Sequence, residues 1–366
     1  MAKTLLNQIE PQFGEEEKKA LLDYLNSGGW LTEFEKTREF ERMLANYLGC
    51  RYACVVSNGT AALTASLMAL GITRPDEVLV PDLTLIVDAN VVLTCGATPV
   101  LIDIDKKSLC SSLELVKGSM SSAVKAIILV SLNGRSADVE AIVEYAKERG
   151  IHVIEDAAQS LGSKHSGRYL GTFGDVGCFS FSMPKIVTTG QGGAVVTDDA
   201  EIFDKVRRIK DFGRPRSGVD YHDIVGLNFK FTDLQAVIGI EQMKRLDRNI
   251  ARKRSIFSIY REVLRDVPSI EFVDTDLSHV TPWYVDILLA SSRIKSGLVN
   301  HLQSAGIKTR PFYPPIHTQP PYAHARGRFP VSTWASECGL WLPSSLTLED
   351  NDIRYVSDAI RDFLKN

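Results

Sequence analysis

The chain has 366 residues, of which 44% are hydrophobic and 24% charged, and a formal net charge of -3 at pH 7. This length and composition allow a large buried core and favour a large domain plus a smaller one. The small net charge gives no electrostatic argument for binding nucleic acid or an anionic membrane.

Cysteine usage and the N-terminal residues indicate a cytoplasmic protein. The six cysteines form no CxxC pair and mostly lie in apolar, strand-like stretches, which is typical of buried free thiols in a reducing compartment. Residues 1–19 lack a long apolar core and soon become acidic, unlike a secretory signal. The most apolar run, residues 83–95, is interrupted by Asp88 and Asn90 and is too short to span a bilayer. We expect no metal site, no nucleic-acid partner and no membrane partner.

Helices and strands alternate along most of the chain. Apolar residues at helical spacing predict helices over residues 15–26, 36–48, 60–70, 84–93, 137–148, 200–212, 232–245 and 249–264. Apolar runs predict strands over residues 53–56, 77–81, 98–103, 124–132 and 152–154. Such alternation with fully apolar strands is typical of a mainly parallel sheet covered by helices on both faces. Ligands in that architecture bind at the carboxyl ends of the strands, and Asp156 stands at such an end.

The turn at residues 57–60, SNGT, leads from a predicted strand into a predicted helix. Backbone amides at a helix N-terminus, with the hydroxyls of Ser57 and Thr60 and a Gly59 that permits close approach, can bind a phosphate group. A capped helix with no ligand is the alternative, and these residues alone favour the cap.

Lys185 is the single cation on a glycine-flanked loop. Residues 178–182 predict a strand before it, and residues 194–197 predict a returning strand after the glycines that follow it. Burial on such a hairpin would lower the pKa of the lysine and leave a neutral amine able to attack a carbonyl. Most lysines, however, are solvated surface charges.

The composition changes near residues 240–250, where we place a domain boundary. An irregular loop over residues 213–223 precedes this boundary. After it, apolar patterns predict strands over residues 269–272 and 283–288 and helices over residues 296–305 and 348–363. Residues 309–322 are rich in proline and aromatic residues. Thr347 would cap the last helix.

Three separate features of the sequence match the groups that one type of cofactor needs. Lys185 could form a Schiff base with an aldehyde cofactor, the helix start at residues 58–60 could bind the phosphate of that cofactor, and Asp156 could pair with a ring nitrogen. Pyridoxal 5'-phosphate (PLP) needs these three groups, because a carboxylate that keeps its pyridinium protonated makes it an electron sink. Taken alone, Asp156 favours the alternative role of capping a following helix.

At this point the chain resembles a known family. Residues 155–199, EDAAQSLGSKHSGRYLGTFGDVGCFSFSMPKIVTTGQGGAVVTDD, resemble the signature of the DegT/StrS nucleotide-sugar aminotransferases, which belong to the fold type I PLP enzymes. Supporting strings are GWLT at 29–32, SNGTAAL at 57–63, GATPVLIDID at 96–105, GLNFKFTDLQAVIG at 226–239 and TRPFYPPIHTQPPY at 309–322. The last two also resemble the branch that aminates C4 of GDP-4-keto-6-deoxymannose to GDP-perosamine.

The resemblance implies an α/β fold with two domains. Residues 1–245 would form a large PLP-binding domain, with a mainly parallel, seven-stranded sheet between helices. Residues 246–366 would form a smaller α+β C-terminal domain.

The resemblance also implies roles for residues at the cofactor. Lys185 would bond to the cofactor aldehyde and then, once freed, move the proton between the reacting carbons. Asp156 would hold the ring nitrogen, and Gln159 would contact the ring hydroxyl. The phosphate would be bound by Gly59, Thr60, the amide of Ala61, Ser180 and, from a second subunit, Asn228. An obligate homodimer with active sites at its interface would follow.

Substrates and departures from the family pattern complete these expectations. L-glutamate would donate the amino group, with pyridoxamine phosphate formed on the way, and the sugar nucleotide would be contacted by Trp30, Thr32, Tyr313 and His317.

Leu85 stands where many relatives place an aromatic residue and would make an apolar cofactor contact. Gln191 replaces a usual glutamate, and Glu33 with Phe34 changes the entrance loop near Thr32.

Two alternatives stay open. A family member of this kind could act on a UDP- or dTDP-linked 3- or 4-keto sugar, and a non-catalytic regulator that binds PLP or a sugar nucleotide would share much of the site. A nicotinamide-dependent oxidoreductase is disfavoured because the chain has no GxGxxG string.

Overall fold

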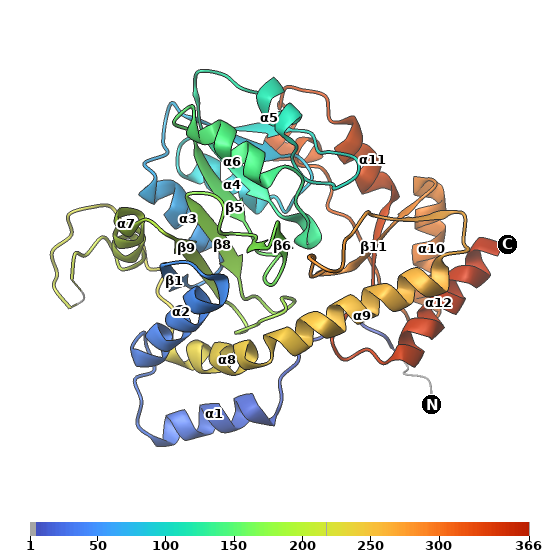
Figure 1. Cartoon of the computed structure of the whole chain (residues 1–366), viewed down its shortest axis with the longest axis horizontal. Helices are drawn as coiled ribbons and strands as arrows, with labels where there is room; N and C mark the ends of the chain where they lie inside the picture. Colours follow the sequence, from blue (N-terminus) through green and yellow to red (C-terminus); the bar gives the residue numbers. More distant parts are fainter. Residues whose placement is uncertain (1–4, 217, 366) are drawn as a thin grey trace.

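A seven-stranded sheet lies at the centre of the N-terminal part of the protein (Figure 1). The structure is a computed structural model that describes residues 5–216 and 218–365. The strand order is β1-β9-β8-β5-β4-β2-β3, and within this sheet only β9 runs antiparallel to its neighbours. The strands are β1 (Tyr52–Val56), β2 (Glu77–Pro81), β3 (Thr98–Ile102), β4 (Val124–Val130), β5 (His152–Asp156), β8 (Val176–Ser180) and β9 (Gly193–Thr197).

Helices cover both faces of this sheet because alternate strand residues point to opposite sides. Val78 and Val80 join the core that contains α3, α4 and α7, whereas Leu79 joins the core beneath α5 and α6. A third core packs α2 and α8 against β1, β8 and β9. The helices are α1 (Glu15–Asn26), α2 (Glu35–Leu48), α3 (Gly59–Ala69), α4 (Val87–Thr94), α5 (Leu113–Gly118), α6 (Val139–Lys147), α7 (Ala200–Lys210) and α8 (Asp233–Lys244).

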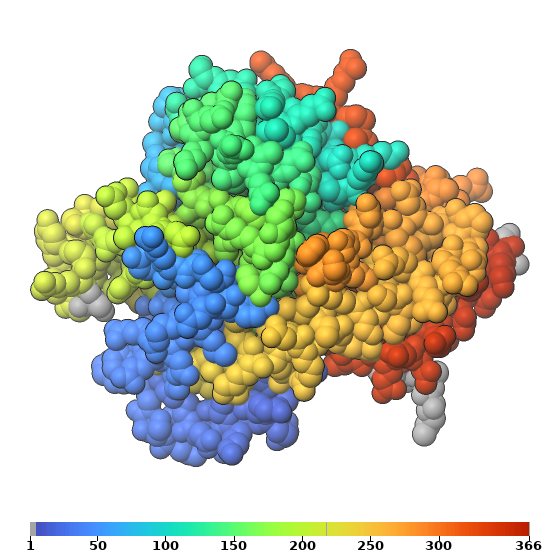
Figure 2. Space-filling model, in the orientation of Figure 1, coloured from blue at the N-terminus to red at the C-terminus, as the bar shows by residue number. Residues whose placement is uncertain are grey.

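A second, antiparallel sheet of order β10-β11-β13-β12 organises the C-terminal part. Its core also contains Leu6, which pairs with Ile307. The long helix α9 crosses the lower surface of the molecule in Figure 2. The elements are α9 (Leu246–Leu264), β10 (Ile270–Phe272), β11 (Val285–Leu289), α10 (Ser292–Ser304), β12 (Arg310–Pro311), α11 (Pro330–Cys338), β13 (Gly339–Leu342) and α12 (Asp350–Lys365).

The remaining elements are short. A two-stranded sheet pairs β6 (Lys164–His165) with β7 (Arg168–Tyr169). Single 3-10 turns are η1 (Leu132–Gly134), η2 (Ile316–Thr318) and η3 (Pro320–Tyr322). In residues 5–216 and 218–365, no helix combines the length and the apolar character needed to cross a bilayer.

The expected α/β class is confirmed by this mostly parallel sheet with an antiparallel sheet behind it. Several boundaries differ from the predictions. Helix α4 begins at Val87 instead of residue 84, because Asp82 is held by the distant segment at Ile316 and His317. Thr347 does not act as the expected helix cap, since its hydroxyl donates to Glu10 Oε2 at 3.1 Å.

Helix α11 and strand β13 were not predicted. The first turn of α11 is capped from far away in sequence, because Asp103, which follows β3, accepts hydrogen bonds from the amides of Val331 and Ser332. Local sequence carries no sign of such a cap.

Candidate active site

Lys185 lies on the connection between β8 and β9, which pair antiparallel as the expected hairpin. It faces a pocket lined by Ala158, Gln159, Leu161, Ser180, Ile186, Thr281, Pro282 and Trp283. The lysine Nζ stands 3.8 Å from the centroid of the Trp283 ring, and that ring is fixed by a 2.7 Å hydrogen bond from its Nε1 to the carbonyl of Pro184. The hairpin therefore presents the amine to a walled pocket.

The surroundings of Lys185 make its amine easy to deprotonate. The pKa of Lys185 is lowered to about 8: burial is the main cause and Arg310 adds to it, while Asp156 and Asp88 act in the opposite direction. Near neutral pH an amine with this pKa has a far larger neutral fraction than an ordinary lysine, and the neutral form can act as a nucleophile and as a base.

Asp156 is the last residue of β5, at the carboxyl edge of the sheet. It is buried, and its Oδ1 accepts a hydrogen bond from the amide of Ala158 at 2.9 Å. No helix follows β5 directly, so the alternative role as a helix cap does not apply. Burial raises the pKa of Asp156, whereas the Ala158 amide, Lys185 and Asp88 lower it. A buried carboxylate here can face a cationic ring nitrogen.

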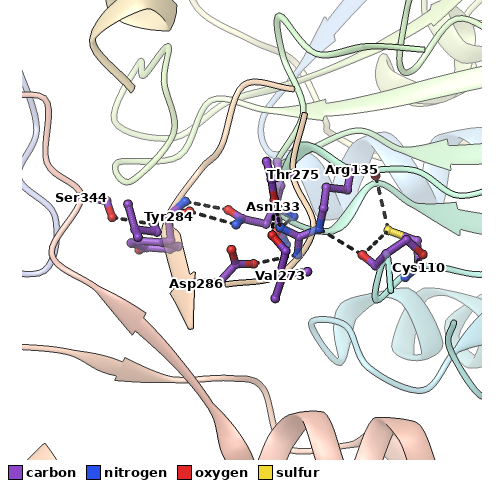
Figure 3. Close-up of polar contacts among 11 residues, drawn as sticks. Cys110, Asn133, Arg135, Val273, Thr275, Tyr284, Asp286 and Ser344 are labelled. Carbon is purple, nitrogen blue, oxygen red and sulfur yellow. Dashed lines mark hydrogen bonds and ion pairs between the residues drawn. The ribbon is translucent and has the colours of Figure 1, made fainter. Parts of the chain in front are cut away.

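Gln159 is oriented by Asn133, which belongs to a network of polar contacts that reaches Tyr284 and the C-terminal sheet (Figure 3). Its Oε1 accepts the amide N–H of Asn133 at 2.9 Å, which leaves its Nε2 as a donor toward the pocket. Asn133, in the left-handed conformation at φ 54, bonds both backbone groups of Tyr284, at 2.9 and 2.6 Å. Beside it, Arg135 and Asp286 form a buried ion pair at 2.7 Å.

The start of α3 is both capped and open to a ligand. Asn58 Oδ1 accepts the amide of Ala61 at 2.8 Å, so the Ala61 N–H that we expected to bind phosphate is already used. Within the described chain, the amides of Gly59 and Thr60 have no hydrogen-bond partner. A Cβ on Gly59 would lie 3.1 Å from the Cβ of Ser180, which shows how closely the end of β8 approaches this cradle.

These groups fit PLP. The two amides without a partner and the Ser180 hydroxyl suit its phosphate, the buried Asp156 suits its ring nitrogen, and the Lys185 amine suits its aldehyde.

An aromatic and cationic cluster borders the same site. Tyr313 is buried, and its pKa is raised by that burial. The guanidinium of Arg310 lies 5.2 Å from the Tyr313 ring and 5.7 Å from the Trp341 ring. His317 Nδ1 lies 2.7 Å from Asp82 Oδ2, and the His317 ring stacks on Phe329 at 4.7 Å.

Comparison with known proteins decides the family. Residues 11–361 match the DegT/DnrJ/EryC1/StrS aminotransferase family. The chain belongs to this family. It is therefore a PLP-dependent sugar aminotransferase, as the resemblance implied, and the non-catalytic alternative loses its support.

Two curated relatives of this aminotransferase are GDP-perosamine synthases. The protein from Escherichia coli O157:H7 is 36% identical over 354 residues, which cover 97% of each chain. The protein from Vibrio cholerae is 36% identical over 358 residues, which cover 97% of this chain and 98% of that one. The solved aminotransferase TlmJ from Streptoalloteichus hindustanus superposes with a TM-score of 0.94, at 29% identity and 99% coverage of each chain.

Of the predicted site residues of the aminotransferase, Gln159 and Ser180 line the pocket together with Lys185. The others are not part of its lining, and they include Trp30, Thr32, Leu85 and Asn228. All four are exposed, Trp30 at 66% and Leu85 at 44%. Their proposed contacts thus need either bound ligand or a second subunit.

The unusual Glu33 and Phe34 have structural partners in the aminotransferase. Glu33 Oε1 pairs with the buried Lys210 at 2.9 Å, and Asp233 accepts the amide of Phe34 at 2.8 Å. The exposed Gln191 uses its backbone carbonyl, which accepts the side-chain amide of Gln235 at 2.6 Å. Residues that the sequence analysis identified only as departures from the family pattern therefore make contacts that hold the entrance loop in place.

Sequence reasoning missed several residues of the site: Asp88, Trp283 and Arg310 near the amine, Asn133 at Gln159, and Asp82 at His317. Asp88 offered one signal, because a charge inside an apolar run is seldom buried without a reason. Trp283 lies in a predicted strand with no chemical pattern of its own. Arg310 lies in the string TRPFYPPIHTQPPY, from which the resemblance pointed to Tyr313 and His317 and not to the arginine.

Proposed function

We propose that this aminotransferase moves the amino group of L-glutamate to C4 of GDP-4-keto-6-deoxymannose and so forms GDP-perosamine. The observation that carries the reaction type is the Lys185 amine, with a pKa lowered to about 8, in a pocket beside the buried Asp156. The sugar is supported by two GDP-perosamine synthases that are 36% identical over nearly the whole chain. A UDP- or dTDP-linked 3- or 4-keto sugar is the alternative substrate.

The residues of the chain divide the work. PLP, when bound, supplies the electron sink. Lys185 Nζ would hold the cofactor through its aldehyde and, when free, would take and return the proton at the reacting carbon. Asp156 would keep the ring nitrogen protonated, and Gln159 would donate its Nε2–H to the ring oxygen. Trp283 shields the amine from water, which strengthens every electrostatic contact there.

Phosphate binding in this proposal rests on the amides of Gly59 and Thr60 and on the Ser180 hydroxyl. Anions are stabilised at a helix N-terminus because its first amides point outward and carry partial positive charge. The Ala61 amide contributes indirectly, since its bond to Asn58 holds the first turn of α3 in place.

Arg310 is the residue best suited to bind a carboxylate of L-glutamate. Among the described residues it forms no ion pair, although it lies near enough to Lys185 to lower the pKa of that lysine. Its hydrogen-bonding partner is Tyr284, a neutral phenol. A guanidinium without an acidic partner beside the reacting amine suits a bidentate carboxylate.

We also propose a homodimer in which Asn228 reaches the phosphate of the partner's site. The segment between α7 and α8 projects from the left edge of the molecule (Figures 1 and 2). It exposes Val225 by 79% and Leu227 by 43% of their surfaces. Exposed apolar side chains gathered on one segment indicate a protein contact, and Asn228 follows them directly.

The substrate can be tested in a half-reaction. Enzyme loaded with pyridoxamine phosphate is offered 3- and 4-keto sugars linked to GDP, UDP or dTDP, and the return of the pyridoxal absorbance is followed. We expect GDP-4-keto-6-deoxymannose to react fastest. Lys185→Ala is the control and should slow the reaction by about 10²–10⁴-fold, since general acid–base catalysis is lost. A faster reaction with another sugar refutes the substrate, and no reaction with any sugar refutes the function.

A further inference from the structure

A second buried carboxyl lies beside Asp156. Asp88, on the first turn of α4, is fully buried, and Asp156 is 6% exposed. The two side chains lie within hydrogen-bonding reach of each other. Asp88 Oδ2 accepts a hydrogen bond from the hydroxyl of Thr84 at 2.7 Å, whereas Asp88 Oδ1 is buried and no group of the described residues donates a hydrogen bond to it.

The surroundings of Asp88 and Asp156 hold too little positive charge to neutralise two ionised carboxylates. The titratable groups that face Asp88 are Asp156 on β5, Lys185 on the β8–β9 connection, Cys178 on β8 and Tyr313 beyond β12. Among them Lys185 alone can be a cation, and its own pKa is only about 8. Two adjacent carboxyl groups in so dry a place cannot both ionise, so one retains a proton.

The proton belongs on Asp88. Burial raises the pKa of Asp88 well above its usual range, and Asp156 raises it further. Burial also raises the pKa of Asp156, but there the Ala158 amide, Lys185 and the hydrogen bond with Asp88 act in the opposite direction. Asp88 Oδ1, which has no donor, is the natural position for the acidic hydrogen.

We propose that Asp88 is a neutral carboxylic acid that donates a hydrogen bond to Asp156, so that the pair carries one negative charge and presents it to the ring nitrogen of the cofactor. Asp88 is thus a positioning residue that acts through Asp156, and its effect on PLP rests on the proposed function. The donated hydrogen bond keeps Asp156 ionised and prevents it from turning toward Lys185.

The proton itself can be observed without cofactor. The infrared difference spectrum between the apoprotein and its Asp88→Asn variant at neutral pH should contain the C=O stretch of a protonated carboxylic acid, which shifts in D₂O. Asp103→Asn is a matched control. Asp103 follows β3 and accepts three hydrogen bonds, two from amides and one from a hydroxyl, so its replacement should remove no signal of a protonated acid. A difference spectrum for Asp88 that shows only ionised carboxylate overturns the proposal.

Cofactor binding separates a neutral Asp88 from an ionised one. Asparagine is a neutral isostere that can still donate to Asp156, so Asp88→Asn should keep the PLP dissociation constant within about threefold of wild type. Asp88→Leu removes the donor and should weaken PLP binding by about tenfold to a hundredfold, the usual effect of losing a hydrogen bond to a charged group. Melting curves of the apoproteins check that both variants fold.

The outcomes are distinct. Equal weakening in Asp88→Asn and Asp88→Leu, or none in Asp88→Leu, refutes the proposed role of Asp88. A wild-type protein that takes up no PLP refutes the proposed function instead, while the infrared measurement still decides where the proton lies.

Discussion

Lys185 is influenced by two buried carboxyl groups, Asp88 and Asp156, and by the guanidinium of Arg310. The carboxyl groups favour its charged form, whereas burial and Arg310 favour its neutral form, and the sum is a pKa of about 8. If Asp88 is neutral, Asp156 is the buried carboxylate that stays ionised and can pair with a protonated Lys185. The reactivity of one amine thus depends on three side chains from distant parts of the chain.

Replacing Arg310 by glutamine should weaken the use of the amino donor. We expect the KM for L-glutamate to rise by about tenfold to a hundredfold, because a charge-assisted, bidentate contact with its carboxylate is lost. The KM for the keto sugar should change little, and Arg310→Lys should lie in between because lysine keeps the charge but not the fork.

Arg328 supplies the control, since it is an exposed arginine in the same part of the chain. Arg328→Gln should leave both KM values as they are. An Arg310→Gln enzyme with an unaltered KM for L-glutamate would exclude carboxylate binding by Arg310.

At the scale of one element, the first turn of α3 combines a structural and a binding role. The Asn58 side chain caps the helix through Ala61, while the amides of Gly59 and Thr60 stay available. A helix start can serve both purposes because capping satisfies only some of its outward amides.

Two substitutions of Asn58 should separate these roles. Asn58→Ala removes the cap and should lower the free energy of unfolding by about 1 kcal/mol. Asn58→Asp keeps a side-chain acceptor and suits the helix dipole, so the apoprotein should stay as stable as wild type. Its negative charge, however, should repel the cofactor phosphate and weaken PLP binding. Thermal unfolding of the apoproteins and PLP titrations measure the two effects, and tight PLP binding by Asn58→Asp would contradict the phosphate site.

At the scale of the whole molecule, the site depends on contacts between its two sheets. Asn133, which follows β4, bonds to Tyr284 just before β11, and the Arg135–Asp286 ion pair lies beside it. Because Asn133 also bonds to Gln159, the C-terminal sheet helps to hold Gln159, which we expect to face the cofactor. The domain division at residues 245 and 246 stays a prediction.

Subunit mixing tests the proposed dimer. Lys185→Ala and Asn228→Asp proteins should each be nearly inactive, but a mixed dimer should contain one site with both native residues. Random exchange of subunits should therefore restore about a quarter of the wild-type activity, since half of the dimers are mixed and each has one intact site of two. A mixture as inactive as its components would show that Asn228 does not serve the partner's site.

Much of the fold could be predicted from local patterns. The apolar runs over residues 77–81 and 124–132 predict strands that the structure contains as β2 and β4. The elements and boundaries that were not predicted share one cause, which is a contact with a distant part of the chain. Helix α11 depends on Asp103 as a distant cap, and the late start of α4 depends on the contact between Asp82 and His317. Local sequence contains no information about a partner hundreds of residues away.

The sequence by itself determined the family and the cofactor and singled out Lys185 as the candidate lysine, because the strings around residues 155–199 are long, ordered and tied to one chemistry. Only the tertiary structure decided which side chains surround that lysine. Lys185 meets Trp283, and Asp156 meets Asp88, through contacts between separate strands and helices. Desolvation and charge proximity set pKa values and depend on distance in space, which spacing along a chain does not specify.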